Sequence, residues 1–378
     1  MAALKDEMII NGMRLRNRIA LPPLTTNYGT PEGVVTEDIL DFYADRSKDV
    51  GLVIVEATAV RPDGRLVRGS LGLWEDGQTA GMKQLADSIK TAGAAAVVQL
   101  NHAGARCVPS GGELQGASPS GFPFRPDVAP LIMNQAQIDQ LAADFAHAAV
   151  RAAEAGFDGV EIHGAHYYLI SQFLSPLTNQ RNDRYGGGAR ERSAFALDVV
   201  RAVRQRLGQS YPIFFRLNAV EKVAGGQTLE DALTVSKLLA DEGVDVLDVS
   251  VIANSSWNEI DGRRFLAASS ALSKEQPAGA NVSAAAAVRE AAGLPVIAVG
   301  KLGEEDEAAE ALRDFSIDIV AIGRQMIVDP AATEKILAGK SDEIIRCEEC
   351  MTCFASIRSE KPMACKVNRK LPGSRRSG

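Results

Sequence analysis

The chain has little of what binds nucleic acid or crosses a membrane. Its formal net charge is -7 over 378 residues, and the only basic cluster lies in the C-terminal tail. Nucleic-acid binding depends on clustered Lys and Arg, so we expect no nucleic-acid partner. No apolar run reaches the roughly 18 residues of a membrane-spanning helix. The first residues lack the apolar segment of a signal peptide. We therefore expect a cytoplasmic protein without a membrane partner.

Cysteine and histidine are also scarce, with five and four residues respectively. Cys107 stands alone, whereas Cys347, Cys350, Cys353 and Cys365 gather near the C-terminus. Four closely spaced cysteines in a chain without an export signal indicate a metal or cluster site before a disulfide framework. The residues leave three alternatives open, namely a [4Fe–4S] cluster, a zinc ion and a segment of free thiols.

Short apolar, β-branched runs alternate with longer helical patterns along most of the chain. The runs are nearly all apolar, as expected of parallel strands that are covered by helices. Eight strand–helix units in series predict an α/β fold of the (β/α)8 TIM barrel type. An open doubly wound sheet would usually carry G-x-G-x-x-G after its first strand, and none stands there. The predicted strands are residues 18–24, 52–60, 95–102, 159–163, 213–219, 246–252, 295–301 and 318–322.

The active site of such a barrel forms at the carboxyl ends of its strands, so the end of each run matters most. The fourth run ends among His163, His166, Tyr167 and Tyr168. Two histidines there can donate hydrogen bonds to a substrate oxygen and stabilise its developing charge. A nearby tyrosine can supply a proton. The alternative is a structural polar pair, while zinc fits poorly because no acidic third ligand is close in sequence.

Basic residues and glycines mark three other strand ends. The fifth run ends with Arg216-Leu-Asn218, and a buried guanidinium there needs an anionic partner or several acceptors. The seventh and eighth runs end in Gly300 and Lys301 and in Gly323 and Arg324. Barrel enzymes often bind phosphate at this place through backbone N–H groups that glycine leaves accessible. These ends therefore predict a phosphate site, although each glycine could serve only a turn. Residues 108–131 are rich in Gly, Pro and Ser and predict a long loop over the site.

Residues 161–187, EIHGAHYYLISQFLSPLTNQRNDRYGG, resemble the signature segment of the Old Yellow Enzyme family of flavin oxidoreductases. Further stretches resemble that family in the same order along the chain. They are NRIALPPLTT (17–26), GLVIVEATAV (51–60), VVQLNHAGAR (97–106), FRLNAVE (215–221) and VAIGRQMIVDP (320–330). The resemblance covers almost the whole chain. It implies non-covalent FMN at the barrel mouth and NAD(P)H as the electron donor.

The resemblance also implies which residues contact the flavin. Gln99 would face the pyrimidine ring. Arg216 would stabilise the negative charge that reduced flavin carries near N1. Thr25 stands where some members have Cys. The implied lining and phosphate contacts are Pro23, Leu24, Thr25, Ala57, Gln99, Arg216, Gly300, Lys301, Gly323 and Arg324.

His163 and His166 match the substrate-activating pair of that family, and Tyr168 matches its proton donor. The implied function is an FMN-dependent ene-reductase that passes hydride from NAD(P)H through FMN to an activated alkene, such as an α,β-unsaturated carbonyl. A flavin/iron–sulfur dehydrogenase or electron-transfer subunit acting on a dienoyl thioester or amine is the alternative. A flavin-free barrel lyase or aldolase is a second rival, for which Lys301 is the only Schiff-base candidate.

The spacing Cys347-x2-Cys350-x2-Cys353-x11-Cys365 is similar to the iron–sulfur segment of the 2,4-dienoyl-CoA reductase and trimethylamine dehydrogenase branch. This likeness implies a [4Fe–4S] cluster. We predict that residues 1–340 form the FMN-binding barrel and that residues 341–378 form a Cys-rich extension packed on it. The sequence leaves the oligomeric state open, including a possible homo-oligomer.

Overall fold

Eight parallel strands close into a barrel in the computed structural model, which describes residues 2–108, 117–128 and 130–375. The strands follow one another around the barrel in chain order, and the last pairs with the first. The predicted TIM barrel and its eight strands are confirmed, although the first, seventh and eighth strands are shorter than predicted. The strands are β3 (Ile19–Leu21), β4 (Leu52–Ala59), β5 (Ala95–Asn101), β8 (Gly159–Gly164), β9 (Ile213–Glu221), β10 (Val246–Ile252), β13 (Val296–Val299) and β14 (Ile319–Ala321).

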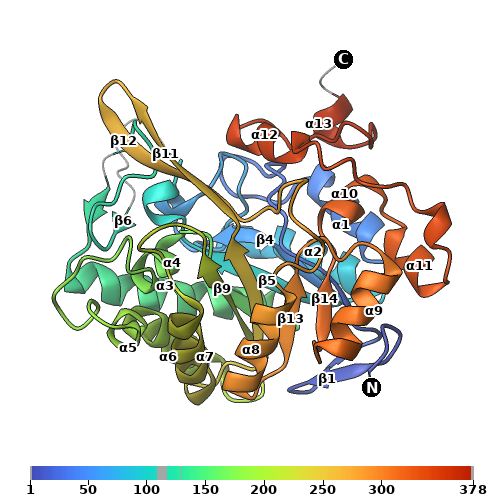
Figure 1. Cartoon of the computed structure of the whole chain (residues 1–378), viewed down its shortest axis with the longest axis horizontal. Helices are drawn as coiled ribbons and strands as arrows, with labels where there is room; N and C mark the ends of the chain where they lie inside the picture. The colour runs from blue at the N-terminus through green and yellow to red at the C-terminus, as the bar shows by residue number, and fades with distance from the viewer. Residues whose placement is uncertain (1, 109–116, 129, 376–378) are drawn as a thin grey trace.

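Helices surround the barrel, and several begin at residues that satisfy their first backbone N–H groups (Figure 1). The Thr228 hydroxyl accepts a hydrogen bond from the Asp231 N–H, and the Asp231 carboxylate accepts one from the Thr228 N–H, which together form a capping box. The α-helices are α1 (Glu37–Arg46), α2 (Thr79–Thr91), α3 (Gln135–Glu154), α4 (Leu169–Leu174), α5 (Ala189–Arg192), α6 (Ala194–Leu207), α7 (Leu229–Asp241), α8 (Val282–Ala292), α9 (Glu305–Asp314), α10 (Arg324–Val328), α11 (Ala332–Leu337), α12 (Thr352–Arg358) and α13 (Pro372–Arg375). Short 3₁₀ turns are η1 (Pro62–Gly64), η2 (Asp76–Gln78), η3 (Gly104–Arg106) and η4 (Ser341–Glu343).

Side chains on the two faces of the strands enter two different parts of the core. One face fills the barrel interior with apolar residues such as Ile54, Val97 and Phe214. The other face packs against the helices and contributes Val53 and Val98 to the larger cluster. Burial on both faces explains why the strand sequences are almost continuously apolar.

Two hairpins were not predicted from the sequence. β1 (Met8–Ile10) and β2 (Met13–Leu15) pack against the apolar interior of the barrel. β11 (Asn254–Ile260) and β12 (Arg263–Ser269) form the second, longer hairpin. Their turns are Asn-Gly and Asp-Gly pairs with positive φ at both residues, which is the usual turn signal of a tight hairpin. Two short strands that pair with each other, β6 (Ala117–Ser118) and β7 (Leu131–Ile132), lie in and at the end of the predicted loop 108–131. Residues 109–116 and 129 of that loop lie outside the described residues.

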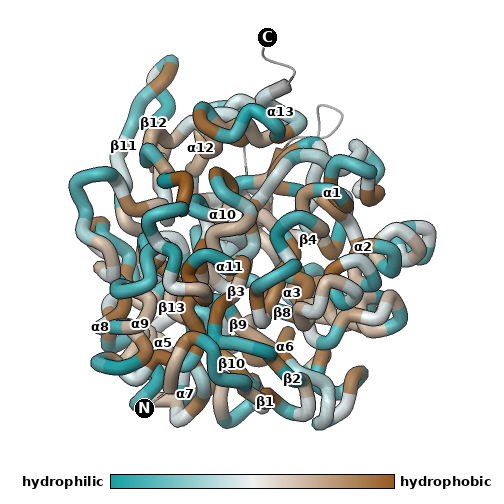
Figure 2. The backbone as a smooth tube through the Cα atoms, turned by 90° about the vertical axis from the view of Figure 1, so that its right-hand side faces the viewer, coloured by the Kyte–Doolittle hydropathy of each residue, from teal (hydrophilic) through white to brown (hydrophobic). Residues whose placement is uncertain are grey.

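The hairpin β11–β12 and helices α12 and α13 lie at one end of the molecule, opposite the N-terminus (Figures 1 and 2). Hydrogen bonds hold the C-terminal segment, residues 341–375, against residues that follow β3. The Tyr28 hydroxyl donates to the Met363 carbonyl at 2.6 Å, and the Met363 N–H donates to the Thr26 carbonyl at 2.8 Å. This segment therefore forms part of the surroundings of the barrel mouth. Among the described residues, no helix is both long and apolar enough to span a membrane.

Candidate active site

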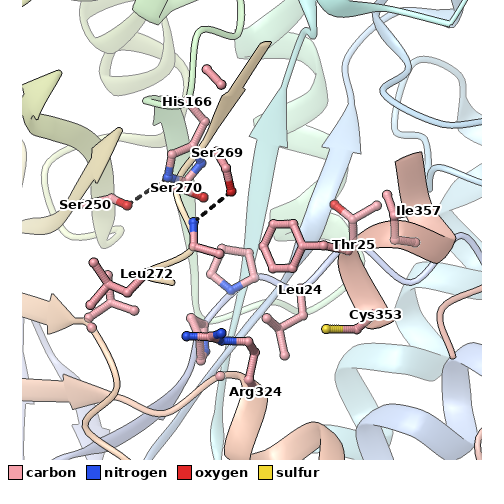
Figure 3. A pocket seen from close by; sticks show the side chains of 18 of the residues that line it. Leu24, Thr25, His166, Ser250, Ser269, Ser270, Leu272, Arg324, Cys353 and Ile357 are labelled. Atoms are coloured by element: carbon pink, nitrogen blue, oxygen red, sulfur yellow. Dashed lines mark hydrogen bonds between the residues drawn. The ribbon is translucent and has the colours of Figure 1, made fainter. Parts of the chain in front are cut away.

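A cavity of about 1080 Å³ opens at the carboxyl ends of the strands. Strand ends, the hairpin β11–β12 and the C-terminal segment all contribute to its wall (Figure 3). Every residue that the sequence predicted for flavin or catalysis lines it. These residues are Pro23, Leu24, Thr25, Ala57, Gln99, His163, His166, Tyr168, Arg216, Gly300, Lys301, Gly323 and Arg324. Cofactor and ligand pockets extend to about 1,000 Å³, so the cavity has room for a nucleotide-sized cofactor.

The two histidines at the end of β8 contact each other inside the cavity wall. His163 Nε2 lies 3.3 Å from His166 Nδ1, and His166 Nε2 lies 2.8 Å from the Ser250 hydroxyl. Figure 3 shows this contact between His166 and Ser250 as a dashed line. Burial, followed by the positive charge of Arg216, holds the pKa of both imidazoles well below 6.5. Both rings are therefore neutral near pH 7, and each has one N–H to donate.

A backbone contact assigns the tautomers of this pair. The Ala165 N–H donates to His163 Nδ1 at 3.3 Å, which places the His163 proton on Nε2. That proton is directed at His166 Nδ1, so His166 carries its own proton on Nε2 and donates it to Ser250. An oxygen atom of a ligand could take the place of either acceptor.

Tyr168 and Tyr167 point into different surroundings. The Tyr168 ring packs edge-on against His163, with centroids 4.9 Å apart, and the Arg106 guanidinium lies 5.4 Å from its centre. Burial raises the pKa of Tyr168, and the charges of Arg106 and Arg216 oppose that rise. Tyr167 is fully buried against Phe124 and does not line the cavity. Of these two tyrosines, Tyr168 is therefore the one with access to a cavity ligand.

Arg216 lies on β9 between two polar neighbours of the adjacent strands. It is in register with His163 on one side and with Asp248 on the other. Its Nε lies 3.3 Å from Asp248 Oδ2. Gln99 donates a hydrogen bond to Glu161 at 2.7 Å. Both predicted contacts of the flavin ring are thus held by buried carboxyl groups.

The ends of β13 and β14 meet at the opposite side of the cavity. Gly300 has a φ of 147°, in the region that favours glycine. The Lys301 amine is already engaged, because it forms an ion pair with Glu349 at 2.6 Å and donates to the Gln276 carbonyl at 2.8 Å. Arg324 lines the cavity from the first residue of α10. The structure therefore brings the four predicted phosphate-binding residues together, but the Lys301 side chain points at Glu349.

The four C-terminal cysteines line a second, smaller cavity next to the first. Cys347, Cys350, Cys353 and Cys365 all contribute to its wall, and Arg324 lines both cavities. All four are free thiols. Among the described residues, no group of three or more His, Cys, Asp or Glu side chains is arranged to hold a metal ion. The predicted cluster residues are thus brought together without forming a single-ion site.

Three further residues contact His166 in the structure. Ser250 accepts from His166, and Asn218 accepts from the His166 backbone at 3.2 Å. Arg106 donates to the His166 carbonyl at 2.7 Å. Ser250 lies near the carboxyl end of the predicted strand 246–252, so the position of strand ends could have indicated it. Arg106 lies in a stretch that resembles the family.

Known proteins resemble this chain over most of its length. Residues 8–343 match the model of the NADH:flavin oxidoreductase / NADH oxidase family. The NADH oxidase of Thermoanaerobacter brockii is 38% identical over 346 residues, which are 90% of this chain and 52% of that protein. The NADPH dehydrogenase of Listeria innocua serovar 6a is 35% identical over 335 residues, which are 87% of this chain and 93% of that protein.

A solved structure has the same fold as this chain. A 2-naphthoyl-CoA reductase in complex with 2-naphthoyl-CoA matches with a TM-score of 0.88 at 25% identity, over 97% of this chain and 57% of that chain. This chain therefore spans about half the length of the NADH oxidase and of the 2-naphthoyl-CoA reductase, but nearly all of the Listeria protein.

Proposed function

The chain belongs to the NADH:flavin oxidoreductase / NADH oxidase family, and we propose that it is an FMN-dependent, NAD(P)H-driven ene-reductase. Bound FMN would accept hydride from NAD(P)H and supply it to the β-carbon of an activated alkene. The observation that carries this proposal is the meeting of His163, His166 and Tyr168 on one cavity wall. The relatives named NADH oxidase and NADPH dehydrogenase support NAD(P)H as the donor.

The residues present fit FMN at this cavity. Arg216 offers a guanidinium that is 5% exposed beside the proposed ring site, where it would stabilise negative charge on the reduced ring. At the other end, a Cβ on Gly323 would meet Pro22 at 3.3 Å and Leu24 at 3.4 Å, so a larger residue would crowd this part of the cavity wall. The flavin contacts would be Pro23, Leu24, Thr25, Ala57, Gln99 and Arg216, and the phosphate contacts Gly300, Lys301, Gly323 and Arg324.

The histidine pair would hold the electron-withdrawing oxygen of the substrate. His163 and His166 each have one N–H, which now faces the other imidazole and Ser250. If the two rings turn so that both N–H groups face one carbonyl or nitro oxygen, that oxygen would receive two hydrogen bonds from neutral donors. The bonds would strengthen as negative charge develops on that oxygen, which is the effect that speeds the reaction.

Tyr168 would deliver the proton to the α-carbon of the alkene. Its raised pKa keeps the phenol protonated near pH 7, so it can act as a general acid. The phenolate that remains would lie near Arg106, whose charge lowers the cost of forming it. This role needs a group that touches the substrate, and Tyr167 cannot supply it because it lies outside the cavity.

We also propose a [4Fe–4S] cluster at the four cysteines. Four thiols around one cavity suit a cubane, which is held by four Cys thiolates. Zinc, which four thiolates also bind, is the alternative occupant of these cysteines. In this proposal residues 341–378 form a cluster-binding extension of the barrel, 1–340. A bound cluster would also be compatible with the alternative function, which is that of an iron–sulfur flavin dehydrogenase or electron-transfer subunit.

Reconstitution with FMN distinguishes an ene-reductase from an electron-transfer protein and from a flavin-free enzyme. The purified chain is incubated with excess FMN, desalted, and titrated anaerobically with NADH and NADPH while flavin absorbance is followed. We expect retained FMN, bleaching by a nicotinamide donor, and recovery of the oxidised spectrum after 2-cyclohexenone is added. A chain that retains and reduces FMN but ignores enones and nitroalkenes would instead be an electron-transfer protein. A chain that retains no flavin would be a different kind of barrel enzyme.

A further inference from the structure

Two buried carboxyl groups lie next to the proposed ring site, and the mechanism above does not use them. Glu161 on β8 and Asp248 on β10 occupy the two strands that flank Arg216 on β9. Strand register pairs Asp248 with Arg216 and Glu161 with Gln99. Both carboxyl groups are 0% exposed, and neither lines the cavity. The four side chains therefore form one buried polar cluster across four adjacent strands.

The donors in this cluster are too few for two carboxylates. Gln99 donates to one oxygen of Glu161. The contact from Arg216 Nε to Asp248 is an ion pair without the geometry of a hydrogen bond. Within the described part of the chain, Glu161 Oε2 and both oxygens of Asp248 have no hydrogen-bond donor. Ionised oxygens left in this state would be strongly destabilising.

A single proton on one of the two carboxyl groups supplies a hydrogen-bond donor that the cluster otherwise lacks. The carboxyl groups of Glu161 and Asp248 are close enough to hydrogen-bond to each other. Two carboxylates at that distance repel, whereas an acid and a carboxylate attract through a short O–H···O⁻ bond. The nearby interior side chains from the other strands, such as Val97, Phe214 and Ile297, are apolar and supply no other charge.

We propose that Glu161 and Asp248 share one proton and together hold Arg216 in position toward FMN. Glu161 carries the proton, and Asp248, which is paired with Arg216, is the ionised member. Burial, followed by the charge of Asp248, raises the pKa of Glu161 well above 4.5, in agreement with this assignment. The cluster is then neutral overall. Without the proton, it would place an extra negative charge beside a ring that itself becomes negative on reduction.

The role toward FMN rests on the proposed function, whereas the shared proton does not. The test is the infrared spectrum of the purified protein near pH 7, in which a protonated carboxyl group has its own C=O stretching band. Two variants are compared with the wild type. Glu161→Gln replaces the acid O–H with an amide N–H of similar shape, so the protein should fold and retain FMN. Asp248→Asn removes the partner of the shared proton.

We expect the wild-type minus Glu161→Gln difference spectrum to contain one protonated-carboxyl band. Asp248→Asn should lose the same band, because Glu161 then ionises to pair with Arg216. Other buried acids, such as Glu56, remain in every sample and cancel. If Glu161→Gln does not fold, the Asp248→Asn difference is used by itself, and survival of the band there overturns the inference.

Two results would overturn the inference. One is a wild-type minus Glu161→Gln difference spectrum without the band, which means that Glu161 carries no proton. The other is a band that survives in Asp248→Asn, which means that Glu161 is protonated independently of its neighbour. The outcome is separate from the proposed function. A chain that shows the band but binds no FMN refutes the function alone, and an active flavoprotein without the band refutes the shared proton alone.

Discussion

Replacing the histidine pair tests the step on which the proposed chemistry depends. In His163→Ala or His166→Ala, the substrate oxygen loses one of the two N–H donors assigned above. Loss of one well-placed oxyanion donor costs about 10²–10³ in rate, so each variant should reduce an enone about that much more slowly. The double variant should lose less than the product of the two effects, because the rings orient each other across 3.3 Å.

The assay is a single turnover. Protein reduced with NADPH is mixed anaerobically with 2-cyclohexenone, and the return of flavin absorbance is timed. Binding of a phenol, which mimics the enolate, is measured in parallel and should weaken in both variants. The matched control is His147→Ala, which removes an exposed histidine of α3 far from the cavity and should react like the wild type.

The pH dependence gives a second check on the same assignment. Since the pKa of each imidazole is held well below 6.5, neither ring should titrate between pH 6.5 and 8, and the wild-type rate should show no histidine step there. The reasoning fails if both alanine variants keep wild-type turnover and phenol affinity. The pair would then be structural, as a polar pair at a barrel mouth can be.

Four further predictions follow from named contacts. Arg216→Ala should weaken FMN affinity by roughly 10- to 100-fold, the usual cost of losing a charged hydrogen bond, and unchanged affinity in an FMN titration would remove its assignment. Tyr168→Phe should slow alkene reduction but not flavin reduction by NAD(P)H, whereas Tyr167→Phe should change neither half-reaction in stopped-flow traces. Burial raises the pKa of Glu56 from 4.5 to about 7, so between those pH values the folded chain holds a proton that the unfolded chain has released. The bound proton stabilises the folded chain fully below pH 4.5, and this stabilisation, at most roughly 3 kcal/mol, is lost as pH rises through 7. The free energy of unfolding measured in urea should therefore depend less on pH in Glu56→Gln. Anaerobically purified protein should contain about four irons and four sulfides per chain, and one zinc or no metal would contradict the cluster.

The fold could be predicted from the sequence because both faces of its strands are buried. Continuous apolar runs, such as residues 52–60, exclude an alternating half-exposed sheet, and their regular spacing specifies the barrel. The hairpin β11–β12 was missed because its strand β11 is mostly exposed and polar, so periodicity is weak there. Its Asp261-Gly262 turn was the available signal.

The site residues were predictable by position, but their partners were not. Strand ends point to the same cavity in any barrel of this type, which is why His166 and Arg216 could be named beforehand. The sequence does not show that Ser250 accepts from His166, that Glu349 engages Lys301, or that Glu161 faces Asp248. Such contacts depend on side-chain directions across different strands, and only the folded arrangement fixes them.

The most direct test of the central claim is an anaerobic titration of the FMN-loaded, NADPH-reduced protein with 2-cyclohexenone. We predict that one equivalent of the alkene restores the oxidised flavin spectrum and yields one equivalent of cyclohexanone. A flavin that stays reduced in excess enone and nitroalkene, and is reoxidised only by oxygen or an artificial electron acceptor, would contradict the account.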